Sequence, residues 1–208
     1  AEAQAAQEAI DHIRAEPRGT IRVSCPVTLA QTLMSSLVGE FMNAYPLINV
    51  VMDVTNRRVD VIEEGYDVAL RVRSVVESTN LVMRSFGTHH SSLVGSPSLL
   101  ERLGPPLAPN DLGRFSSLSL PISDGRYVWT FQNADGETRT VEHTPRLIAD
   151  DLTLLRETAI AGVGLTILPN YLCLDAFRSG KLVRALPQWS FMRANLHAVF
   201  ASRRGLLP

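Results

Sequence analysis

The spacing of apolar residues changes repeatedly along the first third of the chain, and each change predicts a different element. Apolar side chains recur at every second position from Thr20 to Cys25, which is the period of a β-strand. Residues 28–44 change to helical spacing, and Pro46 ends that helix. Residues 48–54 are almost continuously apolar, which predicts a strand covered on both faces. The alternation of strand and helix favours a parallel sheet with right-handed crossovers.

Two further elements complete this first segment. Residues 56–64 are expected to form a short helix that turns Val59 and Ile62 inward and ends at Gly65, and residues 67–72 are expected to form a third strand. The segment therefore consists of three strands joined by two helices. The longer helix should bury an apolar face made of Leu29, Leu33, Leu37, Val38 and Phe41.

A second segment of alternating elements begins near Ser91. The dipeptide Asp135–Gly136 is a strong hairpin signal between two short strands. The last expected strand should return to the first segment, so the pattern predicts an α/β fold of two lobes. The expected strands are 93–94, 115–120, 128–131, 139–142, 165–168, 182–186 and 196–201, and the expected helices are 97–103, 151–161 and 169–177.

Residues 1–16 are expected to form a separate helix that ends at Pro17 and Gly19. Its apolar residues follow the spacing of a helical seam, but two heptads are too short for an independent coiled coil. A surface helix packed on its own domain and a dimer contact are both compatible with this pattern. The chain also begins without Met, which suggests a piece of a longer protein. The seam residues are Ala3, Ala6, Ile10 and Ile13.

Composition narrows the class of protein. The 208 residues are 45% hydrophobic and 20% charged, as in an ordinary folded soluble protein. No apolar run approaches the roughly 20 residues of a membrane span, and the first residues do not resemble a secretory signal. We therefore expect a cytoplasmic protein without a membrane partner. A net charge of −1 argues against nucleic-acid binding by this stretch alone, because phosphate neutralisation needs clustered Lys and Arg.

Catalytic and metal-binding signals are weak. Cys25 and Cys173 are far apart and indicate two buried thiols, not a zinc site or a redox pair. The serines, such as Ser117, lack a nucleophile-elbow context, and no base is paired with one of them. The single histidines, including His143, are expected to be surface or satisfied core residues. The Gly162–Gly164 stretch ends a helix where a nucleotide motif would begin one. We expect no enzyme activity and no cofactor.

Polar residues at the carboxyl ends of the first strands predict an anion site. The Thr28 hydroxyl and the first-turn N–H groups can bond a carboxylate at the positive end of the helix dipole. Thr28 could instead only cap its helix, and Pro26 suits a helix start in either case. Thr55 and Asn56 leave the second strand at the same edge, where Asn56 has a turn or helix cap as a slightly favoured alternative. Arg71 could pair with a carboxylate or with a nearby acidic side chain.

Five stretches, taken in order, resemble the effector-binding domain of LysR-type transcriptional regulators. The resemblance extends from about Gly19 to Arg204, and the Ala1 to Glu16 helix is similar to the end of the family's linker helix. The stretches are RVSCPVTLAQTLMSSLVGEFMNAYP, VTNRRVDVIEEGYDVALRV, LVGSPSLLERLGPPLAPNDL, WTF at 129–131 and AIAGVGLTILPNYLCLDAFRSGKLVRALPQW.

This resemblance implies two Rossmann-like lobes joined by crossover strands, as in type II periplasmic binding proteins. Residues 1–18 would end the linker helix, 19–90 with 196–208 would form lobe I, and 91–195 would form lobe II. A small effector, by the residue chemistry an organic acid, would lie between the lobes. Homodimers or homotetramers would contact DNA only through an absent N-terminal winged helix-turn-helix.

The resemblance also adds site residues. It singles out Thr55, because effector-binding members place a polar side chain there, and it points to Pro121 and Ser123 as pocket positions on lobe II. Asp150 and Asp151 look first like helix N-caps, although Asp150 could bond a ligand hydroxyl. The function expected is therefore ligand sensing for a DNA-binding regulator. A solute-binding protein of a transport system, which shares the fold, is the alternative.

Overall fold

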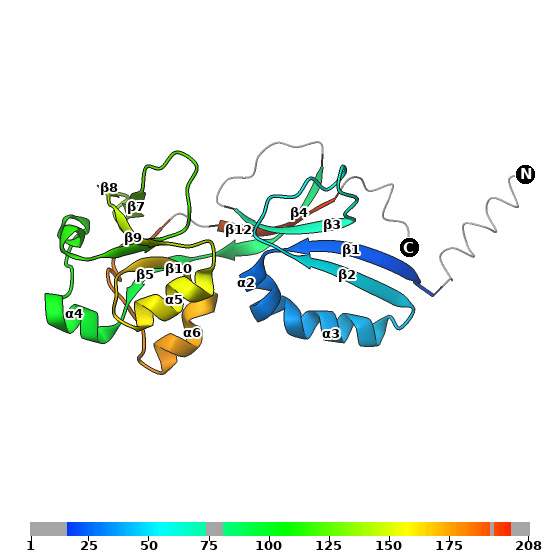
Figure 1. Ribbon diagram of the computed structural model, residues 1–208, viewed down its shortest axis with the longest axis horizontal. Helices are drawn as coiled ribbons and strands as arrows, with labels where there is room; N and C mark the ends of the chain where they lie inside the picture. The colour runs from blue at the N-terminus through cyan, green and yellow to red at the C-terminus, as the bar shows by residue number, and fades with distance from the viewer. Residues whose placement is uncertain (1–15, 74–80, 192–193, 201–208) are drawn as a thin grey trace, which may run out of the picture. The chain divides into compact units, whose positions relative to one another are not determined.

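The chain folds into two compact units, each with its own sheets (Figure 1). The computed structural model describes residues 16–73, 81–191 and 194–200. Within these, the first unit contains residues 16–72, 81–86 and 196–200, and the second contains residue 73, residues 87–191 and residues 194–195. The helix expected over residues 1–16 lies almost entirely outside the described residues.

The first unit is built on a five-stranded sheet with the order β2-β1-β3-β12-β4. β1 pairs with β2 in parallel register, from Gly19 opposite Ile48 to Cys25 opposite Val54, and β3 pairs in parallel with the other edge of β1. The parallel sheet predicted for this segment is confirmed. The strands are β1 (Gly19–Cys25), β2 (Ile48–Val54), β3 (Val68–Arg73), β4 (Val82–His89) and β12 (Ala194–Phe200).

One continuous helix connects β1 to β2, and it contains a π-helical turn. α2 (Val27–Leu29) leads into a π segment (Ala30–Met34) and then α3 (Ser35–Ala44). The helix is present as predicted, but its expected apolar face is only partly covered. Leu29 is buried, whereas Leu33 and Leu37 are 41% and 51% exposed. A π turn makes i→i+5 bonds and changes the angular position of the residues after it, so simple 3.6-residue periodicity misplaces them.

The prediction that β2 is covered on both faces is wrong. β2 lies at the end of the strand order, and Val51 on it is 53% exposed. Apolar side chains of β2, such as Val51, are therefore exposed on the first unit. A run of apolar residues indicates a strand, but the position of that strand in the sheet decides how much of it is buried.

The helix predicted over residues 56–64 is also wrong, because this stretch forms bends and turns. The Asp60 carboxylate accepts hydrogen bonds from the N–H groups of Ile62 at 2.9 Å and Glu63 at 3.0 Å. Such local bonds to the backbone compete with helix formation. Val59 is buried as expected, but Ile62 is 61% exposed. Gly65, which was expected to end that helix, ends a turn instead, at φ +68°.

The second unit has three small sheets and three α-helices among its described residues. β5 lies between β10 and β11 in an antiparallel sheet, β6 and β9 are parallel, and β7 and β8 form the predicted hairpin. Apolar periodicity did not predict β9 or the 3₁₀-helix over Pro109–Arg114. The elements are β5 (Ser91–Gly95), α4 (Pro97–Leu103), β6 (Ser117–Ser119), β7 (Val128–Gln132), β8 (Thr138–Glu142), β9 (Pro145–Ile148), α5 (Leu152–Ile160), β10 (Thr166–Pro169), α6 (Asn170–Arg178) and β11 (Val183–Arg184).

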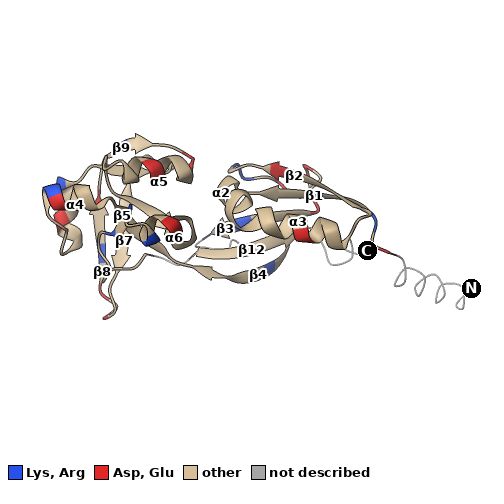
Figure 2. Cartoon of the chain, turned by 90° about the horizontal axis from the view of Figure 1, so that it is seen from below, with Lys and Arg blue, Asp and Glu red and all other residues tan. Residues whose placement is uncertain are grey.

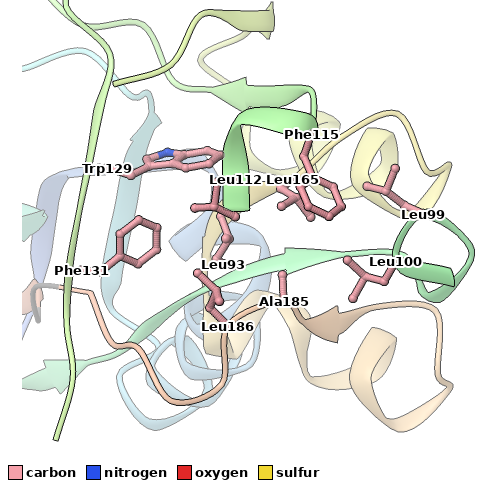
Figure 3. Close-up of a cluster of buried hydrophobic side chains, with 10 residues drawn as sticks. All are labelled: Leu93, Leu99, Leu100, Leu112, Phe115, Trp129, Phe131, Leu165, Ala185 and Leu186. Atoms are coloured by element: carbon pink, nitrogen blue, oxygen red, sulfur yellow. The ribbon is translucent and has the colours of Figure 1, made fainter. Parts of the chain in front are cut away.

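A cluster of buried leucines and aromatic rings forms much of the core of the second unit (Figure 3). Trp129 and Phe131 meet edge to face, with ring centroids 6.4 Å apart, which is a favoured aromatic geometry. Both residues belong to β7, so the hairpin is attached to this core by its inward-facing side chains. The cluster consists of Leu93, Leu99, Leu100, Leu112, Phe115, Trp129, Phe131, Leu165, Ala185 and Leu186.

Candidate functional site

The carboxyl ends of β1 and β2 bring two of the predicted polar segments together in the first unit. The N–H of Thr55 donates to the carbonyl of Cys25 across 2.9 Å, immediately beyond the last paired residues of the two strands. The side-chain oxygen of Asn56 then accepts a hydrogen bond from the N–H of Val27 at 3.1 Å. The exit from β2 is therefore bonded directly to the start of α2.

Asn56 performs the capping role that the sequence offered as its alternative. The first N–H groups of a helix have no acceptors within the helix. Asn56, which follows the neighbouring strand, supplies an acceptor for the N–H of Val27. Pro26 occupies the N-cap position, with φ −58° and ψ 141°, and has no N–H to satisfy. Thr28 lies two residues inside, so the capping role considered for it belongs instead to Pro26 and Asn56.

Thr28 is buried at the first turn of this helix. The first intrahelical donor is the N–H of Ala30, which bonds the carbonyl of Pro26 at 2.9 Å. Because Asn56 accepts from Val27, the N–H groups of Thr28 and Leu29 are the remaining donors of the first turn. The carbonyl of Thr28 accepts from the Thr32 hydroxyl at 2.7 Å, which fixes the second turn.

The segment after β2 is held by side-chain bonds of its own. Thr55 Oγ1 accepts from the N–H of Arg57 at 3.2 Å. The Arg57 guanidinium then forms two bonds to the Glu64 carboxylate, at 2.8 and 2.6 Å. These bonds, and then the N–H of Asp60, lower the pKa of Glu64 to about 2. Glu64 is thus the acidic partner of Arg57 in this stretch of bends and turns.

Arg71 lies in a pocket of the first unit. Its Nη2 donates to the carbonyl of Val59 at 2.9 Å. Neither Thr28 nor Thr55 is among the described residues that line this pocket, so the pocket does not bring Arg71 together with the two threonines. The pocket has a volume of about 400 Å³ and is lined by Arg58, Val59, Asp60, Val61, Ile62, Arg71 and Leu81.

The predicted residues of the second unit follow two parallel strands that end together. The N–H of Ala149 donates to the carbonyl of Ser119 at 3.1 Å, which joins the carboxyl ends of β9 and β6. Pro121 and Ser123 follow β6, Asp150 follows β9, and all three are exposed. Asp151 caps α5, because its Oδ1 accepts from the N–H of Leu154 at 2.7 Å. The N-cap expectation is thus confirmed for Asp151.

The described residues include a serine–histidine pair that was not predicted from the sequence. Ser117 Oγ lies 2.8 Å from His143 Nδ1. The His143 ring packs on Trp129 with centroids 4.1 Å apart, and burial lowers its pKa. Ser117 is only 3% exposed and also lies 3.3 Å from the carbonyl of Thr144, so its hydroxyl is enclosed by the protein. The arrangement is that of a satisfied core pair, and the missed strand β9 explains why sequence spacing did not reveal it.

Thiol and metal chemistry find little support in the described part of the chain. Cys25 and Cys173 are both buried and unpaired, and burial raises each thiol pKa to about 11, which keeps the thiols protonated. Among the residues described, no three His, Cys, Asp or Glu side chains are grouped to hold a metal ion. The helices in the same ranges are too short or too polar to cross a membrane. Figure 2 shows acidic and basic residues dispersed over both units.

The chain is similar to regulators and regulatory domains of one family. Residues 14–208 match the family described as LysR substrate binding domain. An HTH-type transcriptional regulator from Xanthomonas campestris pv. campestris is 31% identical over 211 residues. This alignment covers 100% of the chain and 61% of the regulator, so the chain spans about three fifths of that relative's length.

Solved structures with a similar fold include two from species of Vibrio. The regulatory domain of AphB variant C227S from Vibrio vulnificus is 28% identical, with a TM-score of 0.76 over 88% of this chain and 91% of that one. The full-length virulence activator AphB of Vibrio cholerae is 25% identical, with a TM-score of 0.78 over 98% of this chain and 69% of that one.

Proposed function

The chain belongs to the LysR substrate-binding domain family, and from this premise we propose that it senses a small organic carboxylate held between its two lobes. Its fold class is the one predicted, an α/β fold like the regulatory domains of LysR-type regulators. Its relatives are transcriptional regulators and not enzymes.

The start of the helix over residues 27–44 is the observation that carries the proposal. Helix N-termini bind anions because several N–H groups and the helix dipole point at one place. Here the remaining first-turn donors are the N–H groups of Thr28 and Leu29, and the Thr28 hydroxyl belongs to the same turn. Asn56 fixes this turn through Val27, so the donors would be oriented before an effector arrives. A carboxylate, with two acceptor oxygens, matches such a set of donors.

Polar groups on both units would complete the site. In the first unit, Thr55 leaves β2 beside the start of the helix. In the second, Pro121, Ser123 and Asp150 gather where β6 and β9 end. We propose that these residues contact the remainder of the effector, with Asp150 accepting from an effector hydroxyl. Arg71 instead lines the pocket that it shares with Arg58 and Val59.

The effector would act by shifting a population of conformations. A ligand that touches both lobes favours the arrangement in which both sets of contacts form, and it shifts the equilibrium only by its differential affinity. We propose that homodimers or homotetramers of the complete protein transmit this shift to a winged helix-turn-helix on DNA. The alternative of a transport solute-binding protein is not favoured, because proteins similar to this chain, such as the Xanthomonas regulator, are transcriptional regulators.

Thermal-shift measurements with a panel of organic acids test this proposal. The wild-type chain should be stabilised by at least one acid, since a ligand that binds only the folded state raises the melting temperature. Thr28→Ala and Thr55→Ala should lose most of that stabilisation. Thr138→Ala, at an exposed position of β8, is the matched control and should keep it. Equal stabilisation of the wild type and both site variants would remove Thr28 and Thr55 from the site.

A further inference from the structure

The pocket beside Arg71 has the features of a second ligand site. We propose that it binds a small carboxylate with an apolar body, independently of the donors at Thr28. Every lining residue in the part of the chain that the structure describes belongs to the first unit. Its volume of about 400 Å³ falls within the range of roughly 300–1,000 Å³ typical of small-molecule sites.

The apolar wall of this pocket is part of the core and is therefore rigid. Val59 and Val61 are buried, and they pack with Ala69 and Val199 in the hydrophobic cluster of the first unit. Leu81 packs against the same cluster. Ile62, in contrast, is exposed, which places an apolar side chain where a ligand could cover it. A ligand with an apolar body would remove this surface from water, whereas an inorganic anion would not.

The charges of the lining favour an anion. Among the lining residues that the structure describes, two guanidinium groups, of Arg58 and Arg71, accompany one carboxylate, that of Asp60. Asp60 is already engaged, because its Oδ1 accepts from the N–H groups of Ile62 and Glu63. These bonds offset part of the negative charge of Asp60.

Arg71 is oriented before any ligand binds, because its Nη2 donates to the carbonyl of Val59. An oriented guanidinium fork is well suited to a carboxylate, because hydrogen bonds can form without much further loss of side-chain entropy. Together, the buried apolar wall and the oriented Arg71 indicate a ligand such as an aromatic or branched-chain carboxylate.

Methyl NMR of the whole chain tests the site directly, because Val59, Val61, Ile62 and Leu81 all carry methyl groups. Phenylacetate serves as the probe, and 2-phenylethanol as a neutral molecule of similar shape. We expect phenylacetate to shift the methyl signals of the four lining residues saturably, and 2-phenylethanol to shift them at least about fivefold less at equal concentration, because it lacks the charge that the arginines attract. Equal shifts with both probes would overturn the assignment of a carboxylate site.

A pair of variants at one exposed position separates charge from shape. Ile62→Glu places a carboxylate in the lining, and Ile62→Gln places a neutral group of nearly the same size there. Phenylacetate should bind Ile62→Glu about fivefold or more weakly than Ile62→Gln, as expected for like charges a few Å apart. Equal affinity of the two variants would contradict the proposal.

The same spectra distinguish this site from the one at Thr28. If the pocket is independent, Thr28→Ala will leave the shifts of Val61 and Leu81 unchanged. Shifts confined to Leu29, with none in the four lining residues, would overturn the pocket and leave the proposed effector site standing. Saturable shifts of the four lining residues would support the pocket. If, in addition, every acid of the panel stabilised Thr28→Ala as much as the wild type, the proposed effector site would be overturned while the pocket stood. Loss of the pocket shifts in Thr28→Ala would overturn independence.

Discussion

Asn56 Oδ1 accepts a hydrogen bond from the N–H of Val27 across 3.1 Å, although the two residues lie 29 positions apart in the sequence. The side chain thus acts as an N-cap supplied from a neighbouring strand. It joins the end of β2 to the start of the helix on which the proposed effector site is built. This bond should matter for both stability and ligand binding.

Asn56→Ala should lower the free energy of unfolding by about 1 kcal/mol, the usual cost of losing an N-cap. Urea unfolding followed by circular dichroism would measure it. Asn43→Ala is a suitable control, because Asn43 is exposed within α3 and Ala is the better helix former there. If Asn56→Ala proved as stable as Asn43→Ala, the bond to Val27 would have no net capping value.

Two half-buried histidines, His89 and His143, should make the chain less stable at mildly acidic pH. Burial lowers the pKa of His143, and burial followed by the nearby charge of His90 lowers that of His89. At mildly acidic pH the unfolded chain therefore binds more protons than the folded one. The stability of the folded chain that depends on neutral histidines is complete above about pH 6.5, and it falls as the pH drops toward the folded pKa values. Unfolding in urea at pH 7.5 and 5.5 should show the decrease. His143→Gln should show less of it, and an unchanged pH dependence in this variant would count against His143.

The ion pair between Arg57 and Glu64 predicts a carboxyl that titrates unusually low. The pKa of Glu64, about 2, should rise toward its ordinary value of 4.5 in Arg57→Gln. The stabilisation from this pair is complete above pH 4.5 and is lost as the pH falls through the folded value. Carboxyl carbon shifts followed by NMR would report both values. Arg126→Gln, which breaks an exposed ion pair elsewhere, should leave the titration of Glu64 unaltered.

Two glycine substitutions should have opposite effects on stability. A Cβ on Gly164 would lie 2.5 Å from the carbonyl oxygen of Ser116, so Gly164→Ala should destabilise by about 1–3 kcal/mol through overpacking. A Cβ on Gly39 meets no atom within 4 Å, and Gly39 lies inside α3. Gly39→Ala should therefore stabilise by about 0.5–1 kcal/mol. Urea midpoints of the two variants measured side by side would reveal any failure of this ordering.

Local patterns predicted most elements of the second unit and the parallel arrangement of the first. The helix over 97–103 was predicted at its observed bounds, and the Asp135–Gly136 turn correctly indicated the β7–β8 hairpin. The gathering of Thr55, Asn56 and the start of the helix was also predictable. Parallel strands end at the same edge of a sheet, so residues that follow them meet there whatever the rest of the fold does.

The errors have two causes: local bonding or helix geometry that apolar periodicity does not reveal, and strand pairing between distant parts of the chain. The helix over 56–64 fails since the Asp60 side chain bonds the backbone of the turn, and Leu33 is exposed where a π turn interrupts the helical period. Val51 is exposed because β2 has a strand on one side only. Ser117 meets His143 because β6 pairs with a strand that the pattern did not reveal.

Periodicity and short motifs are local properties of the chain, and they were enough to predict the α/β class, the family and the polar residues at the strand ends. The capping of the helix by Asn56, the pocket that Arg71 shares with Arg58 and the contact between Ser117 and His143 became visible only in the folded units. Hydrogen bonds and burial between residues far apart in sequence depend on how strands pair, and strand pairing is settled by the packing of the whole unit.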